Sequence, residues 1–337
     1  MADSRIAKIY QFHSALAKPL TDFVNEKRGS GFIYNSPSKM LSRFDRFISE
    51  SKQDGCHISR CTFEAYTAKT IYDSERNHQA RYSLIRQFAS FMRLQGYEAY
   101  VPHTERFKRS EPKFVPYIFT ESELHKLFAA ADSYKLHRHG NNNSKLELIL
   151  PVIFKMLYGG GFRVSELTHL KLSDVDFNNS VIKVTQAKFD GERYVPLSDS
   201  LMKKLYDYSA KVHFDSGKDA VFFPKADGSI YSEKAIYQDF RTILWNAGIS
   251  HGGKGNGPRL HDLRHTFAVH RLKYWARQGC DVMAMLPYLS AYMGHTNLNS
   301  TQHYLRLTVD AFPDVLETLE ETYDSIIPRI GGGNDEE

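Results

Sequence analysis

The chain has 337 residues, of which 42% are hydrophobic and 25% are charged, and its formal net charge is +5. This composition is typical of an ordinary globular protein, and the length predicts two domains rather than one compact core. No apolar run reaches the roughly 20 residues of a membrane helix, and the chain start lacks the apolar core of a secretory signal, so we expect a cytoplasmic protein with no membrane contact.

The positive charge is concentrated in the body of the chain. Residues 310–337 contain nine acidic residues and one basic residue, which leaves a net charge of +13 on residues 1–309. Basic side chains are densest in residues 81–113 and 251–277. Such density favours a nucleic acid as partner, although charge by itself is also compatible with a solvated surface.

Residues 1–105 are predicted to form a small helical domain. Ser36 and Pro37 predict the cap and the first turn of a helix that continues with apolar residues at helical spacing. A second helix is predicted over residues 75–95. Residues 106–117 belong to a basic, proline-containing stretch without periodicity and predict an interdomain linker. The outer face of the second helix is expected to carry three basic side chains, Arg81, Arg86 and Arg93.

Residues 118–327 are predicted to form a second domain that mixes helices with one small sheet. Thr120 and Glu123 make a capping box, and an apolar helix is predicted over residues 148–158. Two strand-like segments flank an Asp-Gly pair at residues 190–191, which predicts an antiparallel hairpin. The fold class is therefore mainly α with a small antiparallel sheet, an all-α domain followed by an α+β domain. Residues 328–337 are expected to be a flexible acidic tail.

Two arginines in the second domain suit a phosphodiester. A planar guanidinium can hold two nonbridging oxygens and stabilise the extra charge of a pentavalent transition state, and Arg163 and Arg264 are the candidates. Glycines 159–161 precede Arg163, and a backbone without side chains there would allow a phosphate to approach closely. Taken singly, each arginine could be a surface salt-bridge partner, and the glycines a helix end followed by a turn.

Three polar side chains share one face of a helix predicted to begin near residue 260. His261, Arg264 and His265 are spaced i, i+3 and i+4. The two histidines could instead ligate a metal, but the arginine stands between them, so phosphate contact is the preferred interpretation. Lys188 lies at the mouth of the predicted hairpin, where it could protonate a leaving oxygen, although a single lysine there is more often only exposed.

Tyr304, one of 20 tyrosines, gains significance from the motifs that precede it. In chain order these are Gly-Phe-Arg163-Val-Ser-Glu166-Leu, then Lys188, then His261-Asp-Leu-Arg264-His265, then Met-Gly-His295, and finally Tyr304. The ordered set resembles the tyrosine recombinase, or phage integrase, family, and in particular its two-domain Xer-like members. The resemblance implies a SAM-like, DNA-binding core-binding domain over residues 1–105 and a catalytic domain over residues 118–327.

The resemblance also implies a mechanism. Tyr304 would attack the scissile phosphate and form a 3′-phosphotyrosyl link, with no cofactor and no metal. Lys188 is expected to protonate the departing 5′-oxygen, and His261 to assist with the tyrosine proton. The remaining residues would contact the phosphate or orient these groups: Arg163 and Arg264 as a clamp, His295 as a hydrogen-bond donor, and Glu166 and His265 as supports. One departure from the family is a Lys-Phe-Asp-Gly hairpin in place of the usual Lys-Gly.

Double-stranded DNA is the expected partner. The resemblance implies a homo-tetramer that acts on two DNA sites in the nucleoid. An accessory directionality factor is a possible further partner. A terminal helix is predicted over residues 313–326, and it could dock on a neighbouring protomer or pack on its own domain. Two other functions remain open at this point. One is relaxation of DNA by a type IB topoisomerase, and the other is DNA binding by a protein that has lost catalysis.

Overall fold

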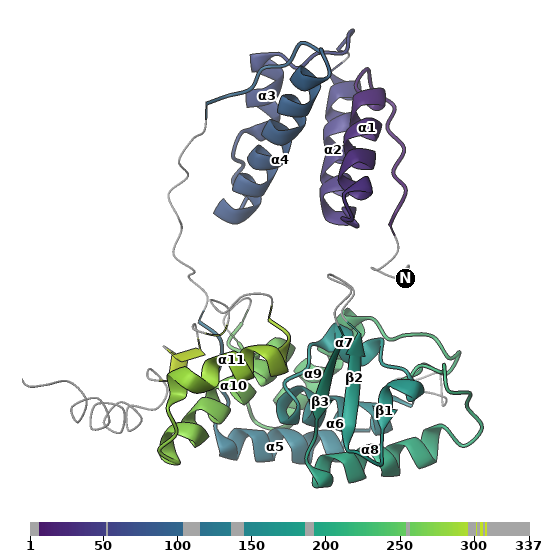
Figure 1. The fold of residues 1–337 in the computed structure, drawn as a ribbon, viewed down its shortest axis with the longest axis vertical. Helices are drawn as coiled ribbons and strands as arrows, with labels where there is room; N and C mark the ends of the chain where they lie inside the picture. The colour runs from purple at the N-terminus through teal and green to yellow at the C-terminus, as the bar shows by residue number, and fades with distance from the viewer. Residues whose placement is uncertain are drawn as a thin grey trace, which may run out of the picture. The chain divides into compact units, whose positions relative to one another are not determined.

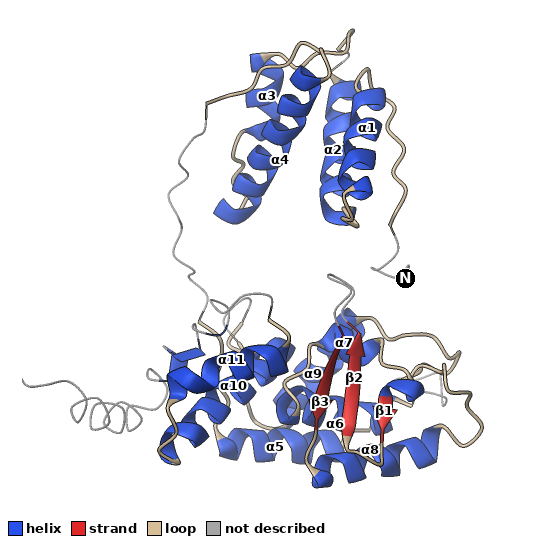
Figure 2. Cartoon of the chain, in the orientation of Figure 1, coloured by secondary structure: helices blue, strands red, loops and turns tan. Residues whose placement is uncertain are grey.

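The computed structural model divides the chain into two compact units, Met1–Phe114 and Val115–Glu337. It describes residues 7–51, 53–103, 115–135, 145–185, 192–253, 257–295, 301, 304–305 and 307–308. The predicted fold class is confirmed, since the described residues are mainly helical and include one small antiparallel sheet (Figure 2). The division between the units falls within the predicted linker, residues 106–117.

The first unit is built from helices that pack around aromatic rings. Phe23, Phe44 and Phe88 are fully buried at its centre, and the ring of Phe88 lies 5.5 Å from Phe23 and 6.3 Å from Phe44. Burying large rings of this kind supplies most of the stability of a small domain. The described helices are α1 Ala17–Gly29, α2 Asn35–Glu50, α3 Arg60–Thr67 and α4 Glu75–Leu94 (Figure 1).

The predicted helices of this unit are present, with one error at a helix start. Helix α4 matches residues 75–95, and Ser74 caps it by accepting from the backbone N–H of Asn77. Helix α2, however, begins at Asn35, one residue ahead of the predicted cap Ser36. Its N-cap is Tyr34, whose φ of 55° is left-handed, so the turn before the helix is made without the Ser side chain.

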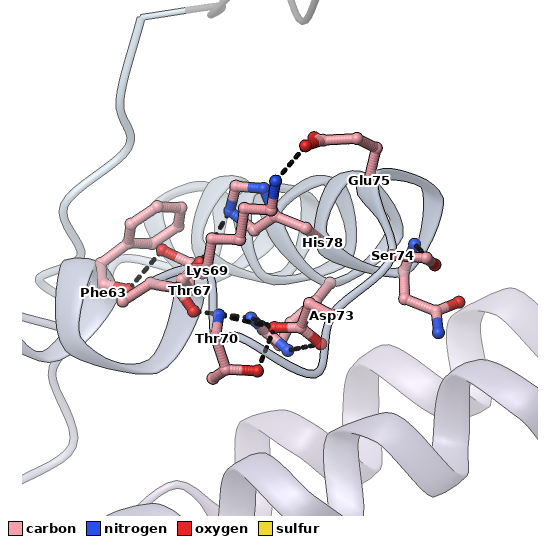
Figure 3. A network of polar contacts seen from close by, with 11 residues as sticks. Phe63, Thr67, Lys69, Thr70, Asp73, Ser74, Glu75 and His78 are labelled. Carbon is pink, nitrogen blue, oxygen red and sulfur yellow. Dashed lines mark hydrogen bonds and ion pairs between the residues drawn. The ribbon is translucent and has the colours of Figure 1, made fainter. Parts of the chain in front are cut away.

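A polar network fixes the loop between α3 and α4 (Figure 3). The Asp73 carboxylate accepts from the backbone N–H and the hydroxyl of Thr70 at 3.0 and 2.9 Å. It also accepts from both terminal nitrogens of Arg81, at 3.1 and 2.7 Å, and these bonds hold the pKa of Asp73 well below its usual range. Arg86 in turn donates to the Pro102 carbonyl at 3.1 Å. The expectation that Arg81 and Arg86 simply point outward is therefore wrong, whereas Arg93 is exposed.

The second unit surrounds one apolar helix. Helix α6, Leu146–Gly159, is buried along most of its length and packs against α5, α8 and α10. In Figure 1, α10 and α11 lie at the left of this unit, and the strands of the sheet overlap α6 in the view. The predicted capping box of Thr120 and Glu123 opens α5. The helices are α5 Glu121–Asp132, α6, α7 Val164–Thr168, a 3-10 turn η1 Leu172–Asp174, α8 Asp199–Val212, α9 Glu233–Asn246, α10 Leu260–Arg277 and α11 Val282–Met293.

The sheet has three antiparallel strands in the order β1-β2-β3. They are β1 Val175–Asp176, β2 Val181–Thr185 and β3 Glu192–Pro196, and β2 pairs with β3 from Val181↔Pro196 to Thr185↔Glu192. The predicted hairpin is thus confirmed in its strands. Its turn, residues 186–191, lies outside the described residues, as do the predicted terminal helix over residues 313–326 and the acidic tail.

We expect Phe88→Ala to destabilise the first unit by about 3–5 kcal/mol, because it removes a fully buried ring and leaves a cavity. Chemical denaturation of the full chain, combined with hydrogen exchange of the α4 amides, measures the effect. Tyr72→Ala is the control: Tyr72 is 91% exposed, and its removal should change stability by no more than about 0.5 kcal/mol. Equal losses in the two variants would contradict the described core.

Candidate active site

Arg264 lies in the interior of the second unit, near the start of α10. Its side chain is only 1% exposed. The guanidinium donates to the carbonyl oxygens of Gly161 and Met293 and to Nε2 of His295, the last at 3.1 Å. Burial, and next the positive charge of Arg163, lower the pKa of Arg264 to about 10. The group therefore remains a cation at neutral pH and is held by neutral acceptors.

The glycines before Arg163 are required by packing. Gly160 and Gly161 are buried, and Gly161 has a left-handed φ of +59°. A Cβ on Gly161 would lie 2.6 Å from the Phe267 ring, and one on Gly160 would lie 2.2 Å from the Phe162 ring. Protein side chains fill the space in which a phosphate was expected to approach these two glycines, so that expectation is wrong. Their close packing instead brings the Gly161 carbonyl to Arg264.

Glu166 is the buried carboxylate that holds two further arginines. Its oxygens accept from Arg193 at 2.9 and 2.8 Å and from Arg163 Nη1 at 2.7 Å. It also accepts from the backbone N–H of Arg163, at the start of α7, at 2.8 Å. Burial opposes ionisation of the carboxyl, but the bonds from Arg193 outweigh it and hold the pKa of Glu166 at about 2. The supporting role expected for Glu166 thus has a clear physical basis.

Arg193 was not among the predicted site residues. The strand pattern contains the signal that could have found it, because Arg193 and Val195 occupy the inward-facing positions of β3, which are the buried ones. An arginine at such a position is rare unless it has a charged partner. Here the partner is Glu166, so an inward-facing arginine on a predicted strand indicates a buried ion pair.

The C-terminus of α11 accepts from all three arginines. Arg193 Nε donates to the Tyr292 carbonyl at 3.0 Å, Arg264 Nη2 to that of Met293 at 2.6 Å, and Arg163 Nη2 to that of Gly294 at 2.8 Å. Gly294 ends the helix with a φ of 65°, a conformation that glycine adopts without strain. The last carbonyls of a helix carry partial negative charge, which suits three cations.

His295 follows this helix end and is neutral in the described structure. Its Nε2 faces Arg264 Nη2, which can only donate, so Nε2 accepts. The proton therefore resides on Nδ1, which donates to the Thr301 hydroxyl at 2.8 Å. Burial, followed by the charges of Arg264 and Arg163, lowers the pKa of His295 to about 4.

Tyr304 is buried beside these groups, with 3% of its surface exposed. Its hydroxyl lies 3.0 Å from Nδ1 of His265, a residue for which only a supporting role was expected. Its ring stacks at 6.0 Å on that of His295. Burial raises the pKa of Tyr304, against the opposing effect of Arg264 and Arg163, so the phenol is protonated at neutral pH.

His261 stands at the exposed edge of the group, and its ring meets that of His265 edge to face at 4.7 Å. Partial desolvation, and then the charges of Arg264 and Arg163, lower the pKa of His261. Solvent screens this effect at an exposed ring. Lys188 lies in residues 186–191, outside the described part of the chain. The other predicted site residues, Arg163, Glu166, His261, Arg264, His265, His295 and Tyr304, form one connected group.

Comparison with known proteins identifies the class of the chain. Residues 118–310, more than half of the sequence, match the profile of the Phage integrase family. The chain belongs to the phage integrase family. It is therefore a tyrosine recombinase, an enzyme of the class that cleaves and rejoins DNA.

Relatives of this recombinase cover most of its length. The tyrosine recombinase XerC of Oceanobacillus iheyensis is 30% identical over 318 residues, which are 91% of this chain and 93% of the relative. The tyrosine recombinase XerA of Pyrococcus horikoshii is 29% identical over 255 residues, covering 74% and 75%. Among solved structures, the XerH site-specific recombinase bound to palindromic difH substrate matches with a TM-score of 0.61 and 18% identity, covering 85% and 79%. That last likeness concerns the fold alone.

Within the described ranges, no helix of the recombinase is both long and apolar enough to cross a bilayer.

Glu166→Gln should destabilise this recombinase by roughly 3 kcal/mol, since it leaves buried guanidinium groups without their carboxylate. The pKa of Glu166 is lowered from 4.5 to about 2, so its ionisation contributes stability above pH 4.5, and this contribution disappears as the pH falls towards 2. Urea denaturation across that pH range should show a decline in the wild type that is smaller in Glu166→Gln. Glu192→Gln, which removes only an exposed pair with Lys183, is the control. If both variants lost stability equally, the central role of Glu166 would be refuted.

Proposed function

We propose that the protein is a site-specific DNA recombinase that cleaves duplex DNA through Tyr304 and forms a 3′-phosphotyrosyl intermediate. The observation that carries this proposal is the position of the Tyr304 hydroxyl. It is buried, it lies 3.0 Å from the His265 ring, and its ring stacks on His295, which contacts the Arg264 guanidinium. A nucleophile is thus located beside cationic donors that suit a phosphate.

The charges of the site support a phosphodiester as its ligand. Arg163, Arg193 and Arg264 are balanced by the single carboxylate of Glu166, which leaves two positive charges among these groups. Arg163 donates from Nη1 to Glu166 and from Nη2 to the Gly294 carbonyl, and a guanidinium carries five N–H groups, so it has the capacity to bind a phosphate as well. The Arg163 side chain is 33% exposed, and a phosphate can reach it from solvent. Arg163 and Arg264 then form the clamp.

The chemical step follows from these positions. The Tyr304 oxygen bonds to phosphorus as the bond from phosphorus to the 5′-oxygen breaks, and Lys188 protonates the departing oxygen. The phosphotyrosyl link conserves the bond energy, so the reversal needs no ATP and no cofactor. A 5′-hydroxyl attacks the link, the DNA strand is rejoined and the Tyr304 phenol is released.

The histidines complete the proposed machinery. His295 donates a hydrogen bond to the phosphate, whose negative charge offsets the guanidinium charges that now lower the pKa of this imidazole. The family resemblance gives His261 a part in removing the tyrosine proton. Its ring is exposed, so bound DNA could contact it.

We further propose that residues 1–105 are the core-binding domain and residues 118–327 the catalytic domain, and that both contact one duplex. Two solved structures with similar folds were determined with a bound substrate or DNA. These are the XerH recombinase bound to difH substrate and the Tn1549 transposon integrase in complex with transposon right end DNA, with TM-scores of 0.61 and 0.59. Strand exchange between two such sites requires four copies of the chain, one for each strand that is cut.

Covalent trapping on a pool of nicked duplexes tests the nucleophile. The wild type should form a DNA adduct, and mass spectrometry should find it on Tyr304 through a 3′-phosphate. Tyr304→Phe should form none, because it lacks the attacking oxygen. Tyr288→Phe, at a tyrosine that is 70% exposed on α11, should react like the wild type. An adduct that persists in Tyr304→Phe would disprove the assignment.

Arg163→Ala should reduce single-turnover cleavage by at least about 10²-fold, as expected when a donor to the transition-state charge is lost. Binding should persist, because many other cations contact the duplex, and it should weaken steeply between about 50 and 200 mM salt. Quench-flow cleavage and fluorescence anisotropy measure the two quantities. Cleavage at the wild-type rate, or binding that does not respond to salt, would count against the clamp.

A further inference from the structure

The hydrogen bond between His265 and Tyr304 gives the tyrosine proton a specific destination. Nδ1 of His265 lies 3.0 Å from the phenolic oxygen, and the two ring centroids are 5.4 Å apart. Tyr304 is almost fully buried, so bulk water cannot readily take its proton. The atom that receives the proton must therefore belong to a neighbouring side chain.

The chemistry of the neighbours decides which way the proton points. The Arg264 guanidinium acts to lower the pKa of the Tyr304 phenol, and a guanidinium can only donate a hydrogen bond. The phenolic oxygen can therefore only accept from Arg264, which leaves the phenol proton for donation to Nδ1 of His265. Nδ1 is then the unprotonated nitrogen of a neutral imidazole, which is the form that acts as a base.

His265 is better placed than His261 to receive this proton. The His261 ring is exposed, and it meets the His265 ring edge to face at 4.7 Å. Its lowered pKa favours the neutral form, so it can lie beside a charged His265 without a second positive charge. The other charged groups near this pair are Arg163 and Glu166, at the start of α7, and Arg259, the N-cap of α10. The neutral imidazole of His295, after α11, also lies nearby.

We infer that His265 is the catalytic base of the cleavage step, accepting the Tyr304 proton directly at Nδ1, an inference that rests on the proposed function of Tyr304 as nucleophile. As the Tyr304 oxygen bonds to phosphorus, its proton moves to Nδ1 and His265 becomes an imidazolium. The 5′-oxygen leaves with a proton from Lys188. During rejoining the 5′-hydroxyl attacks the phosphotyrosyl link, and the imidazolium returns the proton to the departing phenolate.

The same helix provides a matched control. His270, five residues further along α10, is half-buried, and its Nδ1 lies 3.0 Å from the hydroxyl of Tyr158. This second histidine–tyrosine pair has the same atoms at the same distance but is distinct from the reacting group. A purely structural contribution of such a pair should therefore appear equally in His265 and His270 variants.

Single-turnover cleavage by the full chain tests the inference with His265→Ala, His265→Gln and His270→Ala. Both His265 variants should lose about 10²-fold in rate, since glutamine can hydrogen-bond but cannot accept a proton, while His270→Ala should remain near the wild type. Circular dichroism and DNA binding confirm that each variant is folded. A wild-type rate for His265→Gln would overturn the role as a base.

Two modified reactants separate the acid from the base. A 5′-bridging phosphorothiolate substrate has a thiolate leaving group that needs little protonation, so it should restore Lys188→Ala but leave His265→Ala slow. A fluorotyrosine at position 304 has a more acidic phenol and should partly restore His265→Ala. Rescue of His265→Ala by the thiolate substrate would overturn the inference. A wild type that forms no Tyr304 adduct would overturn the proposed function with it, whereas an adduct formed at equal rates in all variants would overturn the inference only.

Discussion

The site depends on how one buried carboxylate and several backbone carbonyls stabilise three guanidinium groups. At an effective dielectric constant of about 20, two unit charges 4 Å apart interact by about 4 kcal/mol, so three cations inside a protein repel one another substantially. Glu166 bonds to two of them, and its low pKa reflects how strongly they favour its charge. Two positive charges remain uncompensated among these groups, and an anionic phosphate would neutralise them as the pentavalent state adds further negative charge.

The same arginines also position the end of α11, which lies ahead of Tyr304 in the sequence. Three successive carbonyls, from Tyr292 to Gly294, each accept from a different arginine. His295 comes next, contacting Arg264 on one side and Thr301 on the other, and Tyr304 follows. A change at any one arginine would therefore alter both the phosphate contacts and the placement of this segment. The hydrogen bonds of these arginines serve both the fold and the proposed chemistry. The activity of an arginine variant must therefore be compared with its stability.

The sequence predicted the helices and strands more reliably than the structural roles of individual residues. The ordered motifs predicted Arg163, Arg264, His295 and Tyr304 because their residue types and spacing are specific, and the structure brings these residues together. The glycines were interpreted as an opening for a phosphate, since a sequence does not show that Phe267 fills that space. Arg193 was missed because its inward direction depends on strand register.

His265 was identified by its helical spacing, but which residue its ring contacts depends on the tertiary structure. Its position one turn beyond His261 predicts a shared face and does not say which imidazole meets Tyr304. That contact requires Tyr304 to lie against α10, which no local pattern encodes. The choice between two neighbouring histidines therefore rests on packing.

A bound phosphate would also change what the tyrosine needs. In the described structure the cationic charges of Arg264 and Arg163 partly offset the rise in the pKa of the buried phenol. A phosphate between the same groups would take up part of that charge, and it would disfavour a phenolate beside it. The arginines proposed to stabilise the transition state would therefore be less able to ionise Tyr304 once a phosphate is bound. A neutral base within hydrogen-bond distance of the phenol resolves this conflict, because the proton leaves only as the bond to phosphorus forms.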